Sequence, residues 1–401
     1  MQGFDFTALG LLLCLATLVA MVSRRFDLPY ATGLVAAGIG IALLLPRASL
    51  PPLTPGLIYF VLLPPLVFEA AIQIPWRPFR REWPLLAALV TLGVALAAGV
   101  AAVGMHWWAG WSWLGAGLFG VLIAATDPVS VIAAFKQTRV EPRLHLLVEA
   151  ESLLNDGVAA VGFAVLSALA AGGATSVGGV AWRFVVTSVC GVAVGLGVAA
   201  ALILLAGRTT DRLVETTITT LVAYGSFLLA EHFGFSGVLA TLSAGMLVGN
   251  WGFLGRITEG GRAAVLDVWE YAAFLINSII FLLIGGREAQ LVSSFTLEAT
   301  ALAVVLALAG RALAVYPVLL AFGRTRLRVP WAYKHVLFWG GLRGALALAL
   351  ALALPAGVAE RGTIVTVVFA VVAFSVFVQG LTMPGLVRRL GLLVGEGAGS
   401  R

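Results

Sequence analysis

The stretch LHLLVEAESLLNDGVAAVGFAVLSALA, residues 144–170, decides the fold, because it has the length of a membrane span and yet contains Glu151 and Asp156. A bilayer core needs about 20 apolar residues of helix. A charged side chain near its centre costs about 2.5–3.5 kcal/mol even on the lenient insertion scale, so an acid placed there is expected to be functional. The stretch therefore predicts a membrane helix whose carboxylates serve a purpose.

The composition of the whole chain agrees with a membrane protein. Of its 401 residues, 61% are hydrophobic and only 11% are charged, and the mean hydropathy is +1.03. A soluble globular domain does not have this balance, so we expect an all-α polytopic membrane protein. Cys14 and Cys190 both lie in apolar runs, which indicates neither a disulfide framework nor a metal site. We expect no cofactor, and we interpret the first apolar stretch as a retained span and not as a signal peptide.

Apolar runs bounded by charges, Pro and Gly predict about 13 transmembrane helices. The expected spans are residues 5–22, 29–46, 54–75, 84–106, 112–135, 144–170, 177–206, 213–231, 235–250, 264–286, 296–322, 331–354 and 362–386. The eighth and ninth spans are separated only by the residues HFG, and the ninth is short. They are the least certain members of the set.

Lys and Arg in the connections between these spans collect on one side. The residues on that side are Arg24, Arg25, Arg77, Arg80, Arg81, Lys136, Arg139, Arg143, Arg208, Arg212, Arg256, Arg262, Arg324, Arg326, Arg328, Arg388, Arg389 and Arg401. The opposite side has Arg47, Arg183, Arg287 and Arg361. Because basic residues concentrate in cytoplasmic loops, the N-terminus is predicted to be external and the C-terminus cytoplasmic, in a cell membrane. Spread over short loops, these charges do not form a surface for nucleic acid.

Two spans have polar interruptions near their middle. The fifth contains Thr126-Asp127-Pro128, where the proline removes a backbone donor and disfavours helix at the residue before it. The twelfth contains Arg343 within the glycine-rich segment GGLRG, residues 340–344, which permits an unwound backbone. These spans are seven apart, and thirteen spans divide into six, a linker and six. Paired broken helices at corresponding positions predict inverted repeats with the substrate site between them.

The domain limits follow from that division. We expect the first inverted repeat over residues 1–170, a linker helix over 177–206 and the second repeat over 213–390, all within a single transmembrane domain, 1–401. The repeat is inferred from hydropathy, because the two halves are not obviously similar in sequence.

The two acids of the sixth span point in different directions. Glu151 and Asp156 are five residues apart on a helix and project about 140° from each other. A carboxylate in a medium of low dielectric stays protonated unless a cation comes near. We expect Glu151 to have a fixed partner, Arg311 as first choice and Arg343 as second. Asp156 is then left for a mobile ion.

Other oxygen-bearing residues near Asp156 suit a desolvated alkali cation. Ser152 shares a helix face with Asp156, while Thr126 has a hydroxyl beside the break and Glu69 is a further intramembrane acid. Asp127 is expected either to cap the opposing half-helix or to pair with Arg343. A carboxylate that can hold a proton or a cation, but not both, is sufficient for exchange. The alternative for each acid alone is a structural ion pair.

Five segments together resemble one known family. They are ATDPVSV, ESLLNDG, LPPLVFEAA, AGRALAVYP and GGLRGALALALAL, and they extend over nearly the whole membrane region. In them the chain resembles the monovalent cation:proton antiporters, in the branch of NhaP and the eukaryotic sodium–proton exchangers. Thr-Asp-Pro followed by Glu-Ser-x-x-Asn-Asp is the most specific part of the match.

This resemblance implies a fold of thirteen helices with two crossed, unwound helices, in which a mobile core domain moves against a dimer domain. The core is expected over residues 84–170 plus 296–386, with the remainder forming the dimer domain of a homodimer.

The resemblance also implies roles for individual residues. It makes Asp156 the carrier of ion and proton, and Glu69, Ser152 and Thr126 ligands of the transported Na⁺. It makes Glu151 and Arg311 a structural pair, and it places Asp127 and Arg343 at the helix crossing. Asn155, where other branches have a second Asp, implies electroneutral one-for-one exchange.

The predicted function is a transporter and not an enzyme: a Na⁺/H⁺ antiporter in the lipid membrane, active in pH homeostasis, with Na⁺ (or Li⁺) and H⁺ as substrates. A K⁺/H⁺ antiporter of the same fold is the first alternative, because ligand type alone does not set ion size. An intramembrane aspartyl protease using Asp127 and Asp156 is the second, although the Tyr-Asp and Gly-x-Gly-Asp motifs of such enzymes do not surround these acids. The four histidines lie near span ends and are interpreted as interfacial residues.

Overall fold

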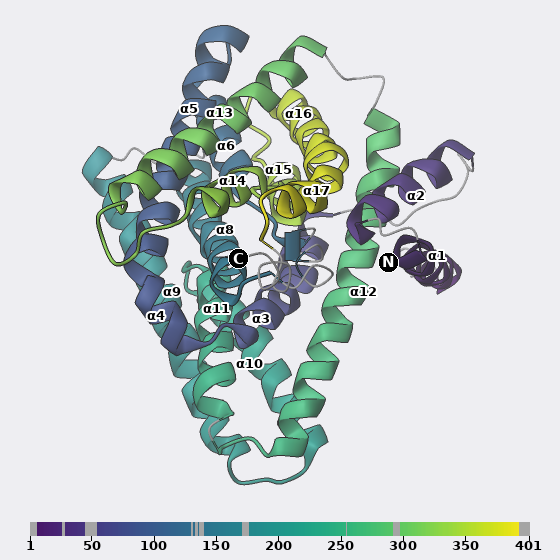
Figure 1. The fold of residues 1–401 in the computed structure, drawn as a ribbon, viewed down its shortest axis with the longest axis vertical. Coiled ribbons are helices and arrows are strands. Elements are labelled where there is room, and N and C mark those ends of the chain that lie inside the picture. Colours follow the sequence, from purple (N-terminus) through teal and green to yellow (C-terminus); the bar gives the residue numbers. More distant parts are fainter. Residues whose placement is uncertain are drawn as a thin grey trace, which may run out of the picture.

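Helices make up nearly all of the structure, a computed structural model (Figure 1). It describes residues 6–25, 29–44, 54–129, 131–132, 135, 140–170, 176–253, 255–291 and 297–392. Arg47, Lys136, Arg139 and Arg401, which contribute to the predicted charge asymmetry, lie outside these ranges.

The first half of the chain forms helices up to the end of the sixth predicted span. They are α1 (Phe6–Arg25), α2 (Tyr30–Leu44), the π-helical turn η1 (Leu57–Leu62) continuing into α3 (Leu63–Gln73), α4 (Trp76–Ala88), η2 (Leu89–Gly93), α5 (Val94–Ala109), α6 (Trp113–Ala124) and α8 (Pro142–Ala170). The segments α4, η2 and α5 form one continuous helix, Trp76–Ala109. It begins eight residues before the predicted span of 84–106, because Arg77, Arg80 and Arg81 extend it as an exposed, charged turn.

The second half has the corresponding series. It contains α9 (Val177–Ala206), α10 (Arg212–His232), α11 (Gly237–Leu247), η3 (Val248–Gly252), α12 (Glu259–Leu291), α13 (Leu297–Ala321), α14 (Trp331–Trp339), α15 (Ala345–Leu352), α16 (Arg361–Phe374), η5 (Ser375–Gly380) and α17 (Leu381–Arg389). The two least certain spans are thus separate helices, α10 and α11. Asp211 and Ser236 explain where they begin, since each side chain accepts a hydrogen bond from a backbone amide of the first turn.

Helices overlap all of the predicted spans. Within the described residues, seven helices are long and apolar enough to cross a membrane. Shorter apolar helices lie at 12–23, 30–44, 57–73 and 113–124. The all-α membrane fold is therefore confirmed, and the number of thirteen crossings stays a prediction.

Two helix pairs cross at glycines. A side chain on Gly38 of α2 would overlap the Leu282 carbonyl of α12, and one on Gly285 of α12 would overlap the Val35 carbonyl of α2. Likewise, a side chain on Gly249, in the η3 turn after α11, would overlap the Ile72 carbonyl of α3. Small residues allow such close backbone approach in membrane proteins. In Figure 1, α12 runs along one side of the molecule with α1 and α2 beside it.

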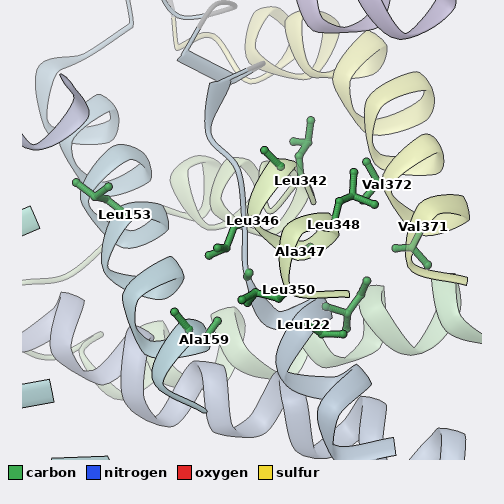
Figure 2. Packing of buried hydrophobic residues seen from close by; sticks show 14 of the residues in the cluster. Leu122, Leu153, Ala159, Leu342, Leu346, Ala347, Leu348, Leu350, Val371 and Val372 are labelled. Atoms are coloured by element: carbon green, nitrogen blue, oxygen red, sulfur yellow. The ribbon is translucent and has the colours of Figure 1, made fainter. Parts of the chain in front are cut away.

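A second region packs around the broken helix that contains α15. Leu346 lies on the side of α15 that faces α8, and Leu348 lies beside Val371 and Val372 of α16 (Figure 2). All residues of α15 up to Ala351 are buried. Because the short helix is buried, its N-terminus lies in the interior of the protein.

Candidate functional site

Two interrupted helices meet at the centre of this region. The first break follows Ala124 at the end of α6, where residues 125–128 leave the helical conformation before Pro128. The second separates α14 from α15 and comprises residues 340–344. The two breaks touch: the Asp127 amide donates a hydrogen bond to the Leu342 carbonyl, with an N···O distance of 2.7 Å. The predicted crossing of two unwound segments is present.

Asp127 caps the start of α15. Its carboxylate accepts hydrogen bonds from the backbone amides of Val129, at 2.9 Å, and of Ala345, the first residue of α15. A side chain at Gly344 would overlap this carboxylate, so glycine is required for the close approach. A negative charge at a helix N-terminus is favourable because the first amides lack partners within the helix. Of the two roles expected for Asp127, the structure shows the helix cap and not the pair with Arg343.

Arg343 binds carbonyl groups at the C-terminal end of α6. Its guanidinium donates to the Ile123 carbonyl in the last turn of α6 at 2.8 Å, to the Gly341 carbonyl, and to the Ala307 carbonyl of α13 at 3.4 Å. The side chain is buried. A cation at the C-terminal end of a helix is favourable for the same electrostatic reason that an acid is at its start. Arg343 therefore lies at the crossing and binds carbonyls, and the described contacts do not join it to Asp127.

Glu151 and Arg311 form a bidentate ion pair. The two N···O distances are 2.7 and 2.9 Å, and both side chains are buried. Arg311 also donates to the Leu337 carbonyl, at 2.8 and 3.2 Å, in the last turn of α14. This one arginine thereby ties α13 to α8 and to the end of the broken helix. Arg311, the first choice from sequence, is the partner that the structure gives to Glu151.

Asn155 and Ser152 connect α8 to the first break. The Asn155 amide donates to the Ala124 carbonyl at 2.9 Å and to the Thr126 hydroxyl at 3.2 Å. The Ser152 hydroxyl donates to the Thr126 carbonyl and lies 3.2 Å from the Thr126 hydroxyl. The freed carbonyls that a broken helix leaves are thus satisfied by side chains one helix away.

Asp156 occupies a different environment from Glu151. It accepts a backbone hydrogen bond from Thr126, and its Oδ1 atom is buried with no hydrogen-bond partner among the described residues. The side chain lines a cavity of about 320 Å³. An ionised oxygen without a partner at such a depth is costly, so it would be stabilised by a proton or by a cation.

The cavity brings together four of the residues singled out from sequence. Glu69, Thr126, Asp127 and Asp156 all line it. The Gln73 side chain donates a hydrogen bond to the Glu69 carboxylate from the next turn of α3. Ser152 is buried behind Thr126 and does not line the cavity, and Glu151, Arg311, Arg343 and Asn155 also lie outside its walls.

Three polar residues of the cavity were not predicted from the sequence to line it: Glu149 and His145 of α8 and Glu270 of α12. Asn277 of α12, a polar residue inside a span that can either face a cavity or bond across helices, lines the cavity as well. Helical spacing would have identified Glu149, because it is seven residues before Asp156. Ser278, beside Asn277, bonds across helices to the Tyr30 hydroxyl at 2.7 Å instead.

Crossed broken helices around a buried acid, inside an all-helical membrane fold, define a secondary transporter. The chain belongs to the transmembrane sodium/hydrogen exchanger family, which it matches over residues 10–389. It is 37% identical to the low-affinity Na⁺/H⁺ antiporter NhaS1 of Synechocystis over 391 residues, covering 96% of this chain and 74% of the relative. It is 34% identical to the Na⁺/H⁺ antiporter NhaP of Pseudomonas aeruginosa over 340 residues, covering 82% of this chain and 80% of the relative.

The fold of the chain is also similar to that of a solved antiporter. The sodium proton antiporter MjNhaP1 from Methanocaldococcus jannaschii, solved at pH 8, superposes with a TM-score of 0.77. The match covers 95% of this chain and 97% of the other, at 20% sequence identity. The resemblance inferred from the sequence motifs is confirmed, and the family is one of transporters, not of intramembrane proteases.

Proposed function

We propose that the protein is a secondary active antiporter that exchanges Na⁺ (or Li⁺) for H⁺ across the membrane by alternating access. The observation that carries this proposal is the Oδ1 atom of Asp156, which has no hydrogen-bond partner among the described residues and belongs to a side chain that lines a cavity. The carboxylate binds a proton or a desolvated alkali cation, and each displaces the other. The relatives NhaS1 and NhaP are Na⁺/H⁺ antiporters, which supports the same substrates for this chain.

The proposed ion ligands are Asp156 with Glu69 and Thr126, which share the cavity. Ser152, a further proposed ligand, lies outside the cavity walls, and its hydroxyl donates to the Thr126 carbonyl. Carboxylate, hydroxyl and carbonyl oxygens are suitable ligands for hard cations. Glu151 with Arg311 is proposed as the structural pair, and Asp127 with Arg343 as the compensation of the helix ends.

Asn155 supports electroneutral one-for-one exchange. Its side-chain amide is spent on the Ala124 carbonyl and the Thr126 hydroxyl, so this position adds no charge to the site. Asp156 is then the carboxylate that alternates between the proton and the cation, and one charge moves in each direction.

The decisive experiment is a cation panel on the wild-type protein. Proteoliposomes containing a pH-sensitive dye are challenged with Na⁺, Li⁺ and K⁺, and we expect Na⁺ and Li⁺ to drive proton flux. Rates that are unchanged by an imposed membrane potential would support the electroneutral stoichiometry. Flux driven by K⁺ alone would favour the K⁺/H⁺ alternative, and the absence of flux with every cation would refute the proposal.

The proposed division into two inverted repeats has support in the helix crossings. Counting seven spans onward, α2 corresponds to α11 and α3 corresponds to α12. The close contact of α2 with α12 therefore has its equivalent in that of α11 with α3, and both are made at glycines. We propose repeats over residues 1–170 and 213–390 about the linker helix α9, with a mobile core of 84–170 plus 296–386.

The remainder, which includes α1, α2 and α9 to α12, is proposed as the dimer domain of a homodimer, with the N-terminus external and the C-terminus cytoplasmic. Exposed apolar residues of α1 and α9, such as Met21 and Trp182, support a lipid or subunit contact there. Light scattering in detergent that gives the mass of one chain would contradict the dimer. Labelling of a cysteine introduced after Arg389 from the external side of intact cells would contradict the orientation.

A further inference from the structure

The continuous helix Trp76–Ala109 is longer than a bilayer core. Its 34 residues extend about 51 Å at 1.5 Å each, whereas the hydrocarbon core is about 30 Å thick. Trp107 and Trp108, exposed near its end, are typical of one membrane–water interface. A bilayer with both headgroup layers is about 40–45 Å thick, which is about 27–30 helical residues. Counting back from Trp107 by that number reaches residues 77–80, so the first turns of α4 lie at the opposite headgroup layer.

An aromatic row runs along these first turns. Trp76, Phe79 and Trp83 are spaced three and four residues apart, so they share one side of the helix. The ring centroids lie 5.9 Å apart for Trp76 and Phe79 and 5.6 Å apart for Phe79 and Trp83. Phe79 is buried, whereas both tryptophans are exposed. Because an indole ring has an apolar body and one polar N–H, exposed tryptophans are suited to the boundary between acyl chains and headgroups.

Three arginines form a second row beside the aromatic one. Arg77, Arg80 and Arg81 are all exposed, and spacings of three and four residues from Arg77 place them on one side of the helix. None of them pairs with a carboxylate among the described residues. Glu82, the one acid between Trp76 and Trp83, is buried. The three positive charges are therefore left for a partner outside the described part of the chain.

Both ends of this segment are fastened to other helices. At its start, the Asn250 side chain of η3 donates a hydrogen bond to the Ile74 carbonyl at 2.9 Å and accepts one from the Trp76 amide at 2.8 Å. At its end, Glu82 accepts two hydrogen bonds from Arg143 of α8, at 2.8 and 3.0 Å. The two rows are thus held on an ordered helix, which lowers the conformational cost of binding a ligand to them.

We propose that the exposed face of Trp76–Trp83 is a binding site for the headgroups of anionic phospholipids. The lipid phosphates bind to Arg77, Arg80 and Arg81, because a guanidinium group matches phosphate oxygens with two parallel N–H donors. The two exposed tryptophans contact the adjoining apolar part of the lipid. A free phosphate ion would satisfy the arginines alone, so the lipid is the occupant that fits both rows. The site does not depend on the exchange reaction proposed above.

The expected size of the effect follows from the contribution of a basic side chain at an anionic membrane surface. Each such residue strengthens binding about fivefold, and salt weakens the attraction. Neighbouring arginines can share one headgroup and then do not contribute independently. Removal of all three should therefore weaken binding about 10- to 100-fold, and removal of one about fivefold.

The test titrates the purified chain in detergent with phosphatidylglycerol and counts bound lipids by native mass spectrometry. The combined variant Arg77→Gln/Arg80→Gln/Arg81→Gln should bind the first phosphatidylglycerol about 10- to 100-fold more weakly than the wild type. Phosphatidylcholine, which has no net charge, should bind weakly and to the same extent in both proteins. Inorganic phosphate should not displace the bound phosphatidylglycerol.

Arg324→Gln/Arg326→Gln/Arg389→Gln is the matched control, because it removes three exposed arginines outside the segment. It should bind phosphatidylglycerol as the wild type does. Thermal midpoints without added lipid should be equal in all three proteins, since the replaced side chains are exposed. If the combined variant does not fold, Arg80→Gln alone takes its place, with an expected loss of about fivefold.

Three results would overturn the site. They are unchanged phosphatidylglycerol affinity in the combined variant, an equal loss in the control variant, and equal wild-type affinity for phosphatidylglycerol and phosphatidylcholine. Displacement of the lipid by inorganic phosphate would show a site for free anions and would overturn the assignment to a lipid.

Discussion

Replacing Asp156 by Asn should abolish cation-driven proton flux in reconstituted vesicles, down to the background of empty liposomes. The substitution preserves shape and removes the carboxylate that exchanges one proton for one cation. It also puts a neutral amide in place of an acid whose buried Oδ1 atom has no hydrogen-bond partner in the described part of the chain, so no described charge pair is lost from the folded state. We therefore expect a thermal midpoint equal to or above that of the wild type.

The same substitution separates binding from transport. When Na⁺ is added to the wild-type protein in weakly buffered detergent, a proton should be released, and Asp156→Asn should release none. Asp211→Asn is a suitable control, because Asp211 is exposed at the start of α10 and Asn caps a helix equally well. Flux retained in Asp156→Asn would refute the carrier role, whereas lost flux in both variants would indicate damage from handling.

Glu151→Ala should lower the thermal stability of the protein. It leaves the Arg311 guanidinium buried with one of its two partners missing, and breaking a buried ion pair in this way costs about 3–5 kcal/mol. The thermal midpoint in detergent should fall by several degrees. Because Arg311 also holds the end of α14 through the Leu337 carbonyl, its displacement should loosen the second break as well.

A double-variant cycle distinguishes a structural pair from two independent residues. Arg311→Met should destabilise about as strongly as Glu151→Ala, because it leaves the acid buried alone. Combining Glu151→Ala with Arg311→Met should cost less than the sum of the single changes, since no charge is then left unpaired. Additive losses, or an unchanged midpoint in Glu151→Ala, would contradict the pairing as a source of stability.

The helices could be predicted from sequence because the apolar runs and the helix-breaking Pro and Gly residues agree along this chain. Pro128 and the glycines at 340–344 identify the two breaks, since each changes what the backbone can do locally. The start of the long helix at Trp76 was not predicted, because arginines in an exposed turn look the same as a loop. The π-helical turns also have no signal in the sequence that we can name.

The sequence predicted which residues belong to the site better than it predicted the contacts between them. The sequence left Glu151 with two candidate arginines, because both lie inside spans, and the choice depends on carbonyls that only the fold places near Arg343. The sequence likewise left two possible roles for Asp127, because only the fold determines which groups lie beside it. Glu149 lies outside the motifs and was not predicted to belong to the site, although its helical register with Asp156 is visible in the sequence. The roles of all these residues in transport remain predictions.

The bonds from Asn155 and Ser152 to the backbone at Ala124 and Thr126 have a consequence for how such a carrier moves. They fasten the unwound segment to the same helix that holds Asp156, so the carboxylate and the Thr126 oxygens are one mechanical body. A cation bound between them can keep its coordination while that body shifts. The conformational work of a transport cycle then falls on the contacts that this body makes with the helices around it, and not on the ion's own ligands.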